Sequence, residues 1–272
     1  MIKIYKPTSP GRRDQTALKV VYDKITSQER KKLTKDLKGP KGRSNGRISV
    51  KHQSRGAKKH LRLIDFKRDN HDIQGNVAAI VYDPNRSANI ALIYYVNGDK
   101  RFILATESMK KGDTVISGEQ VDIREGNSTV LRRIPNGTPI HNIELYPGAG
   151  GRFVKSAGNQ AVITAKDGDK VNVKMPSGEV RVFNANCFAT IGRVSNFEWN
   201  LVKLGKAGRN RHRGVRPTTR GIAQTVNDHI MGGKYSRRIG KQPADEYGNL
   251  SKGKKTRKRK HTNRFIVRDR RA

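Results

Sequence analysis

The segment from Lys203 to Arg238 constrains the chain most, because it is strongly cationic and its apolar residues follow no regular period. Between Lys203 and Arg220 there are seven Lys or Arg residues and no acidic residue. Glycines and Pro217 interrupt any helix or strand. Such a segment buries too little apolar surface to offset its ordering entropy, so we expect it to be disordered alone in water. We predict that it becomes ordered on a polyanion; a solvated basic linker is the alternative.

The charge of the chain is concentrated at its two ends. The 272 residues are enough for one or two domains with a sizeable core, but only 33% of them are hydrophobic and the net charge is +35. Residues 1–62 contain 19 Lys and Arg against 4 Asp and Glu. Residues 63–200 contain 17 against 15, and residues 201–272 contain 22 against 4. A nearly neutral body between two basic arms is typical of a nucleic-acid-binding protein.

The sequence gives little support for a membrane partner or for chemistry at cysteine. The longest apolar runs, 77–82 and 90–96, are far shorter than a membrane span, so we expect no membrane partner. Cys187 is the only cysteine, which excludes an internal disulfide and a multi-cysteine zinc site. Its apolar neighbours favour a buried structural thiol over a nucleophile. The N-terminus has no signal-peptide apolar region, which predicts a reducing compartment where the chain is made.

Residues 1–46 are predicted to form a basic N-terminal extension. The prolines and glycine between Tyr5 and Arg13 oppose helix and sheet alike, and residues 28–43 add a Lys-rich run. Residues 17–22 are weakly amphipathic and predict a strand that docks on the body. We expect the rest of this arm to be extended and bound to something outside the fold.

In residues 47–125 apolar and polar residues alternate, and this period of two predicts a small antiparallel barrel. Their short runs are rich in Ile, Val, Tyr and Phe, and turn residues at 83–86 and 97–98 separate them. About five strands with no room for crossover helices favour a closed sheet. The predicted strands lie within 48–50, 61–66, 76–82, 89–96, 101–105 and 114–117.

Residues 126–200 predict a second small barrel, so the expected fold class is all-β. The alternation from Val171 to Met175 leaves one buried and one solvated face. Phe197 and Trp199 are expected to pack on the body, with base stacking by Trp199 as an alternative. A basic C-terminal extension, 201–272, follows, with Phe265-Ile266-Val267 as a brief apolar anchor. The predicted strands lie within 139–144, 160–165, 170–175, 179–183 and 189–194.

Enzyme motifs are absent from the sequence. There is no phosphate-binding loop with lysine, no Gly-x-Ser-x-Gly and no His-Glu-x-x-His, and no cofactor or metal is predicted. The Gly148-Ala149-Gly150-Gly151 cluster is either a tight turn between strands or a contact with RNA backbone. Asp228-His229 suggests a general base, but adjacent side chains diverge and no nucleophile is placed beside them. We predict that His229 contacts RNA and that the protein is not an enzyme.

The predicted RNA contacts come from dense clusters of cations. Residues 51–60 contain six side chains that can be cationic, directly before a strand, which is typical of a phosphate clamp. Flexible arms suit the irregular grooves of folded RNA, and no groove-reading helix is visible, so RNA is favoured over duplex DNA. The predicted RNA-binding residues are Arg12, Arg13, Lys51, His52, Arg55, Lys58, Lys59, His60, Arg86, Arg152, Lys203, Lys206, Arg209, Arg211, His212, Arg213, Arg216, Arg220, Asp228, His229, Lys254, Lys255, Arg257 and Lys258.

Several stretches, in order along nearly the whole chain, resemble one family. On these stretches the chain is identified as a member of the bacterial-type L-two family of large-subunit ribosomal proteins. The stretches are Tyr5-Lys6-Pro7-Thr8-Ser9-Pro10-Gly11-Arg12-Arg13, Ile64-Asp65-Phe66-Lys67-Arg68, the run from Tyr82 to Leu92, Ile140-His141-Asn142-Ile143-Glu144-Leu145, Pro147-Gly148-Ala149-Gly150-Gly151, Pro176-Ser177-Gly178-Glu179, Ala189-Thr190-Ile191-Gly192, Lys252-Gly253-Lys254-Lys255-Thr256-Arg257 and Phe265-Ile266-Val267-Arg268.

The resemblance implies both a fold and a role. It implies an oligonucleotide-binding-type barrel, then an SH3-like barrel, between two RNA-threading arms. It further implies a primary binder of large-subunit rRNA near the peptidyl-transferase centre, where the RNA performs the chemistry. Implied partners are large-subunit rRNA, neighbouring ribosomal proteins, the small subunit across the subunit interface, and tRNA. A histone-like or chaperone-like nucleic-acid binder and an RNA-acting enzyme are the alternatives.

One loop departs from the family pattern. Relatives usually have Asn-Pro-Val-Asp-His-Pro-His-Gly-Gly-Gly-Glu-Gly there. This chain keeps Asp228, His229 and two glycines. Thr225-Val226-Asn227 replaces Asn-Pro-Val, Ile230-Met231 replaces Pro-His, and Lys234-Tyr235 replaces Gly-Glu. We therefore predict altered rRNA at this loop. The expected location is a ribosome in the bacterial cytoplasm or an organelle, and the altered loop favours an organelle or a reduced genome.

Overall fold

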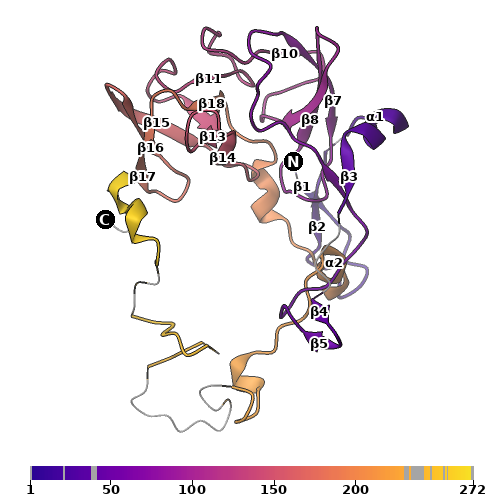
Figure 1. Cartoon of the computed structure of the whole chain (residues 1–272). Helices are drawn as coiled ribbons and strands as arrows, with labels where there is room; N and C mark the ends of the chain where they lie inside the picture. The colour runs from indigo at the N-terminus through magenta and orange to yellow at the C-terminus, as the bar shows by residue number, and fades with distance from the viewer. Residues whose placement is uncertain are drawn as a thin grey trace. The chain divides into compact units, whose positions relative to one another are not determined.

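The computed structural model (Figure 1) describes residues 2–20, 22–37, 42–229, 233, 242–245, 247–253, 255 and 257–270. The chain divides into two compact units. The β-unit comprises residues 1–38, 58–207 and 264–272, and the basic unit comprises residues 39–57 and 208–263. The described residues form mostly strands with few short helices, and no helix among them is long and apolar enough to cross a membrane.

The first sheet of the β-unit is antiparallel and has the strand order β10-β7-β8-β9. Both faces of β8 are buried, because Ile90 and Leu92 pack in one apolar cluster while Ala91 and Ile93 pack in another. These strands lie where the period of two predicts them. Their bounds are β7 (Gly75–Val81), β8 (Ile90–Tyr95), β9 (Lys100–Leu104) and β10 (Thr114–Val115).

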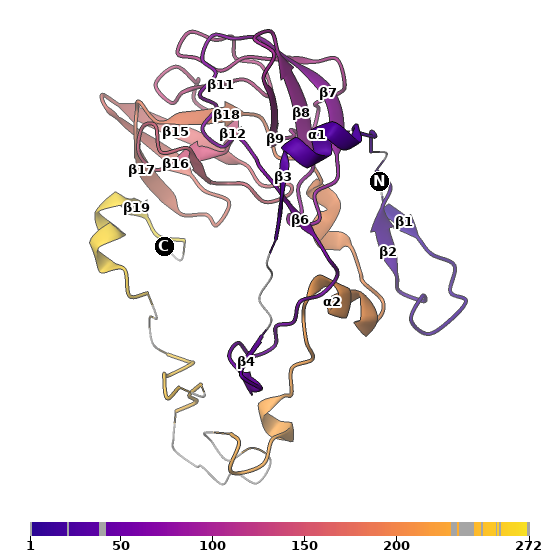
Figure 2. The same ribbon diagram turned by 45° about the vertical axis from the view of Figure 1, so that its right-hand side comes forward.

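The second sheet is also antiparallel and has the order β11-β18-β12-β15-β16-β17-β19. Val171 and Val173 of β16 are buried while Lys170 and Lys174 are exposed, which confirms the predicted alternation. At the apolar anchor predicted at residues 265–267 the chain forms β19, which pairs with β17 (Figure 2), while Val267 stays 60% exposed, so backbone pairing rather than apolar burial holds it. The bounds are β11 (Ser128–Val130), β12 (Pro139–His141), β15 (Ala161–Asp167), β16 (Lys170–Lys174), β17 (Val180–Asn184), β18 (Phe188–Ile191) and β19 (Ile266–Arg268).

Short elements complete the two units. Four two-stranded pairs are β1 (Ile2–Ile4) with β2 (Thr16–Leu18), β3 (Thr34–Asp36) with β6 (His60–Arg62), β4 (Arg43–Ser44) with β5 (Arg47–Ile48), and β13 (Ile143–Glu144) with β14 (Gly151–Phe153). The helices found in the described parts of the chain are α1 (Ser27–Lys32), η1 (Phe197–Leu201), α2 (Ala207–Arg213), η2 (Gly221–Ala223) and η4 (Lys260–Phe265).

Polar contacts join the two sheets within the β-unit. The buried guanidinium of Arg68 donates to the Gly126 carbonyl, with both nitrogens 3.3 Å from the oxygen. The Asn89 amide donates to the Ser195 hydroxyl at 3.1 Å. These hydrogen bonds link the loops that flank the two sheets.

The N-terminal segment is folded where the sequence predicts an extended arm. Thr26 and Glu29 form a capping box at the start of α1. Glu29 is buried and accepts hydrogen bonds from the Tyr94 hydroxyl and from the Lys100 ammonium, the latter at 2.7 Å. The extended prediction is therefore wrong for α1 and β3, because capping and one buried carboxylate outweigh the Lys-rich composition. The strand predicted at 17–22 is shorter, and it pairs with β1.

A second correction concerns α2, in a segment where no regular element was predicted. None of its residues is buried, so apolar periodicity carries no signal for it. Its end is fixed by backbone geometry. Gly214 has φ of 93°, its amide donates to Arg211, and the Val215 amide donates to Asn210, which is the Schellman pattern. Ala and Arg also favour helix.

We expect Glu29→Gln to destabilise the β-unit at pH 7 by about 1–3 kcal/mol, because it removes a charge-assisted partner of Lys100. Hydrogen bonds from Lys100 and Tyr94 lower the pKa of Glu29 to about 2 from its ordinary 4.5. A lowered folded-state pKa gives stability that is present above pH 4.5 and lost as pH falls towards 2. The difference between wild type and variant, measured by urea unfolding, should shrink over that range.

The matched control is Asp167→Asn, which removes the same charge at an exposed hairpin turn. Its free energy of unfolding should stay near that of the wild type at every pH tested. Equal destabilisation by both variants would contradict a specific role for Glu29.

Candidate nucleic-acid interface

A groove of about 520 Å³ lies in the β-unit between the loop after β6 and the loop joining β13 to β14. Phe66 and Lys67 line it from the first loop, and Tyr146 and Arg152 line it from the second and from β14. Phe66 is half-buried, so part of its ring remains exposed. The groove therefore combines an aromatic surface with cationic side chains.

Two cations lie over the Phe66 ring. The Lys155 ammonium is 4.1 Å and the Arg86 guanidinium is 5.6 Å from the ring centroid. Partial burial, followed by repulsion from Arg86 and Arg152, lowers the pKa of Lys155 from its ordinary value. Three like charges thus share this region, and an anion bound there would relieve their repulsion.

A buried carboxylate holds Arg86 in place. Asp83 is fully buried, and one of its oxygens accepts from Arg86 Nε at 2.7 Å. Its other oxygen accepts from the Asn85 amide at 2.9 Å, which fixes the turn that carries Arg86. The Arg86 side chain is still 20% exposed, so part of the guanidinium faces solvent. The predicted turn at 83–86 thereby presents a fixed cation beside Phe66.

The glycine cluster at 148–151 forms a tight turn between β13 and β14, so the turn interpretation is confirmed. Buried Glu144 accepts from the amides of Gly148 and Gly150 at 3.1 and 2.8 Å. The amide of Ala149 donates to Tyr146, and that of Gly151 donates to Phe66 at 2.7 Å. Because all four amides have internal partners, this backbone offers no N–H group to a phosphate without rearrangement.

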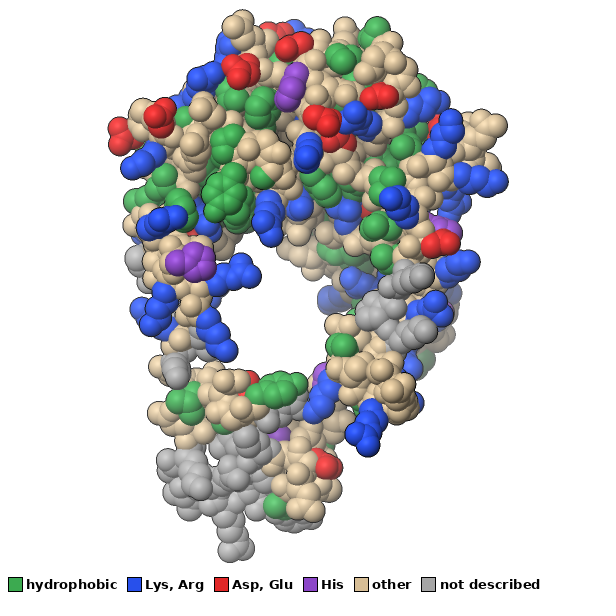
Figure 3. All heavy atoms as spheres, in the orientation of Figure 1, with side chains coloured by type: hydrophobic (Ala, Val, Ile, Leu, Met, Phe, Trp, Pro, Cys, Tyr) green, Lys and Arg blue, Asp and Glu red, His purple; other side chains and the backbone are tan. Residues whose placement is uncertain are grey.

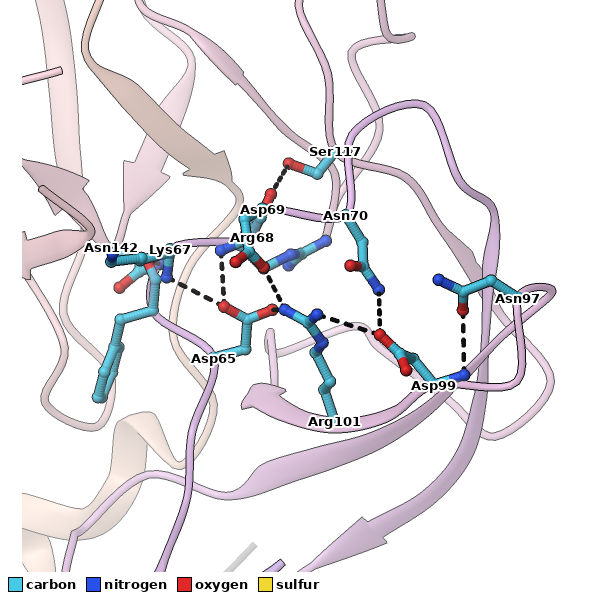
Figure 4. Close-up of polar contacts among 11 residues, drawn as sticks. Asp65, Lys67, Arg68, Asp69, Asn70, Asn97, Asp99, Arg101, Ser117 and Asn142 are labelled. Atoms are coloured by element: carbon cyan, nitrogen blue, oxygen red, sulfur yellow. Dashed lines mark hydrogen bonds and ion pairs between the residues drawn. The ribbon is translucent and has the colours of Figure 1, made fainter. Parts of the chain in front are cut away.

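An ion-pair network around Arg101 fixes the loop that carries Phe66 and Lys67 (Figure 4). Asp65 accepts from Arg101 Nη1 at 3.1 Å and from the amides of Lys67 and Arg68 at 3.1 and 2.7 Å. Arg101 also contacts Asp69 and Asp99. Burial opposes its charge, yet the hydrogen bonds to these carboxylates raise the pKa of Arg101 above its ordinary value.

Predicted residues from both ends of the chain meet in the basic unit. The Ser54 amide donates to Gly214, and the Ala57 amide donates to His212, both at 2.8 Å. This pairing brings Lys51, His52 and Arg55 close to the residues of α2 and the segment after it, namely Arg209, Arg211, His212, Arg213 and Arg216. Figure 3 shows many Lys and Arg and few Asp and Glu on this unit, whereas both signs are mixed on the β-unit.

A separate group forms beside the N-terminal hairpin of the β-unit. The Thr16 amide donates to the Lys203 carbonyl at 3.0 Å, and the side chain of Lys206 lies next to Gly11. The Arg12 guanidinium lies 5.4 Å from the centroid of the Tyr5 ring. Arg12, Arg13, Lys203 and Lys206 are therefore neighbours, which the sequence alone did not predict.

The remaining predicted residues are scattered. Lys58 and Lys59 precede β6, and His60 Nδ1 lies 2.9 Å from Asp36. Arg220, Lys255, Arg257 and Lys258 are exposed, and Lys254 lies outside the described residues. Asp228 accepts from the Thr225 hydroxyl at 2.9 Å, while the His229 ring lies against Gly221. The replaced loop positions Ile230-Met231 and Lys234-Tyr235 also lie outside the described residues.

Two buried titratable side chains, Cys187 and His141, have strongly shifted pKa values. Cys187 is fully buried, and burial followed by Glu144 raises its pKa to about 11, which favours the structural interpretation. Burial lowers the pKa of His141 to about 4, so it is neutral at pH 7. Among the described residues, no three His, Cys, Asp or Glu side chains are grouped to hold a metal.

Sequence reasoning missed Phe66, which lines the groove, and Lys155, whose ammonium lies over the Phe66 ring. Phe66 was assigned to a predicted strand, and Lys155 lies in no cluster of cations, so neither residue was predicted to contact RNA. The sequence carries no signal for Lys155; only the structure shows that the preceding Val154 has φ of 53°, a conformation that a β-branched residue rarely adopts.

Two sequence models of protein families match the chain. Residues 30–117 match the model described as Ribosomal Proteins L2, RNA binding N-terminal domain. Residues 124–248 match the model described as Ribosomal Proteins L2, C-terminal domain. Phe66 and Arg86 fall in the first matched region, and Arg152 and Lys155 fall in the second.

We expect Arg101→Met to loosen the loop that carries Phe66, because it leaves Asp65, Asp69 and Asp99 without their shared cation. Hydrogen exchange at the Lys67 and Arg68 amides, which donate to Asp65, should quicken by roughly tenfold or more, the effect of losing about 1.4 kcal/mol. Arg124→Met is the control, since its ion pair with Asp122 is exposed on both sides. Unchanged exchange in Arg101→Met would refute the positioning role.

Proposed function

The chain belongs to the ribosomal protein L2 family, and from this premise we propose that it is a structural, rRNA-binding component of the large ribosomal subunit. One observation carries the proposal beyond the family: Arg86 and Lys155 lie over the Phe66 ring, and Arg152 lines the same groove, where the two matched regions meet. Clustered cations held against an aromatic ring are groups that bind RNA phosphates.

The mechanism follows from the charges and the ring. Arg86 and Lys155 donate to phosphate oxygens, and counterion release favours the complex. The Phe66 ring supports these two cations, with Lys155 at 4.1 Å and Arg86 at 5.6 Å from its centroid. Asp83 and the Arg101 network hold these groups before the RNA arrives, which lowers the ordering cost of binding. The protein supplies binding and shape and performs no reaction of its own.

The finer parts of the proposal rest on family resemblance. We propose an oligonucleotide-binding-type barrel at 47–125, an SH3-like barrel at 126–200, and basic extensions at 1–46 and 201–272. The proposed place is rRNA near the peptidyl-transferase centre, with neighbouring ribosomal proteins, the small subunit and tRNA as partners. A bacterial cytoplasm and an organelle are both compatible with the family. The altered loop around Asp228 and His229 favours an organelle or a reduced genome.

We expect Lys155→Met to weaken binding to a bacterial large-subunit rRNA transcript by several-fold and to reduce the salt slope of the affinity by about one, because one phosphate contact is lost. Filter binding between 50 and 200 mM salt measures the affinity and its salt dependence, because affinities that depend on phosphate contacts change strongly over this range. Lys111→Met is the matched control, an exposed lysine at the turn before β10. Equal slopes for all three proteins would exclude the groove as an RNA contact.

Sedimentation separates a ribosomal protein from a general nucleic-acid compactor. In high magnesium, the protein should migrate with the large subunit and leave it only in strong salt. A histone-like binder would instead distribute over any nucleic acid in proportion to mass. Migration with bulk RNA or DNA would contradict the proposal.

A further inference from the structure

The basic unit joins two segments that are far apart in the sequence. Gln53 and Val215 form an antiparallel bridge, flanked by hydrogen bonds from the Ser54 amide to Gly214 and from the Arg216 amide to His52. His52 Nδ1 also lies 3.2 Å from the Pro217 carbonyl oxygen. Residues 52–57 and 212–217 are therefore strand-like partners, although each belongs to a different basic arm.

Two glycines adapt the sequence to this pairing. A Cβ on Gly56 would lie 2.6 Å from the His212 carbonyl oxygen, and a Cβ on Gly214 would lie 2.7 Å from that of Ser54. Both residues also have positive φ, 65° and 93°. Side chains at either position would push the segments apart, so the close approach depends on glycine at both.

The energetics of this pairing are unusual. Residues 42–57 and 208–229 contain nine Lys and Arg and one acidic residue, Asp228. The buried apolar residues found among the described parts of the chain all lie between Val77 and Val194, in the β-unit. The backbone hydrogen bonds and the His52 contact with Pro217 thus link two segments whose like charges repel each other. A polyanion between or beside them would remove this repulsion.

We propose that residues 51–57 and 207–217 are one composite RNA-binding module, in which pairing of the segments and binding of a single RNA segment are thermodynamically linked. This inference rests on the proposed function and extends it, because two independent arms would contact separate RNA segments. RNA stabilises the pairing by supplying negative charge. Reciprocally, any change that fixes the pairing beforehand raises the affinity for RNA.

A disulfide tests the linkage directly. Gln53→Cys and Val215→Cys are introduced with Cys187→Ala, which removes the natural thiol. The bridge pattern is that of a non-hydrogen-bonded pair, whose Cα atoms lie roughly 4.5 Å apart, within reach of a disulfide. We expect the oxidised protein to bind a bacterial large-subunit rRNA transcript roughly tenfold more tightly than its reduced form. Each single-cysteine variant should bind equally under both conditions.

Equal or weaker binding by the oxidised form, with wild-type binding retained by the reduced form, would overturn the composite module alone. Failure of the unmodified chain to bind the transcript would overturn the proposed function as well. A second measurement uses an iron chelate attached at Arg55→Cys or at Arg211→Cys, each with Cys187→Ala. Both probes should cleave the same stretch of RNA, and cleavage of two unrelated stretches would refute the module.

Discussion

Scarce carboxylates organise this cationic chain. With 58 Lys and Arg against 23 Asp and Glu, a buried acid is the strongest local influence on where cations and amides are held. Glu29 ties α1 to β8 and β9, Asp83 holds Arg86, and Glu144 closes the glycine turn beneath the groove. Each of these acids is buried and accepts hydrogen bonds from cations or amides.

This arrangement produces two kinds of binding surface. The groove at Phe66 lies in a unit with extensive apolar cores, so its cations are held in place without RNA. The basic unit has backbone pairing and close glycine contacts but no share of those cores among its described residues. A pre-formed surface suits recognition of an RNA shape, whereas a weakly held one suits ordering during assembly.

The sequence predicted what depends on local periodicity and failed where distant segments meet. Alternation predicted β16, and the apolar anchor at 265–267 predicted β19. The capping box at Thr26 and Glu29 was visible in the sequence but hidden by the Lys-rich composition around it, and α2 exposes every side chain. The groove could not be predicted, because Phe66, Arg86 and Lys155 come from three segments and meet only after both sheets form.

The pairing of β19 with β17 makes the long basic segment between α2 and η4 a closed loop whose two ends leave and rejoin the same folded unit. A free tail can slide through a ring of folded RNA at any time. A loop fastened at both ends can enter such a ring only if β19 detaches or if the RNA folds around it afterwards. The order of assembly is thereby restricted by topology: either the last strand adds to its sheet after the RNA is in place, or the RNA closes over a protein already complete.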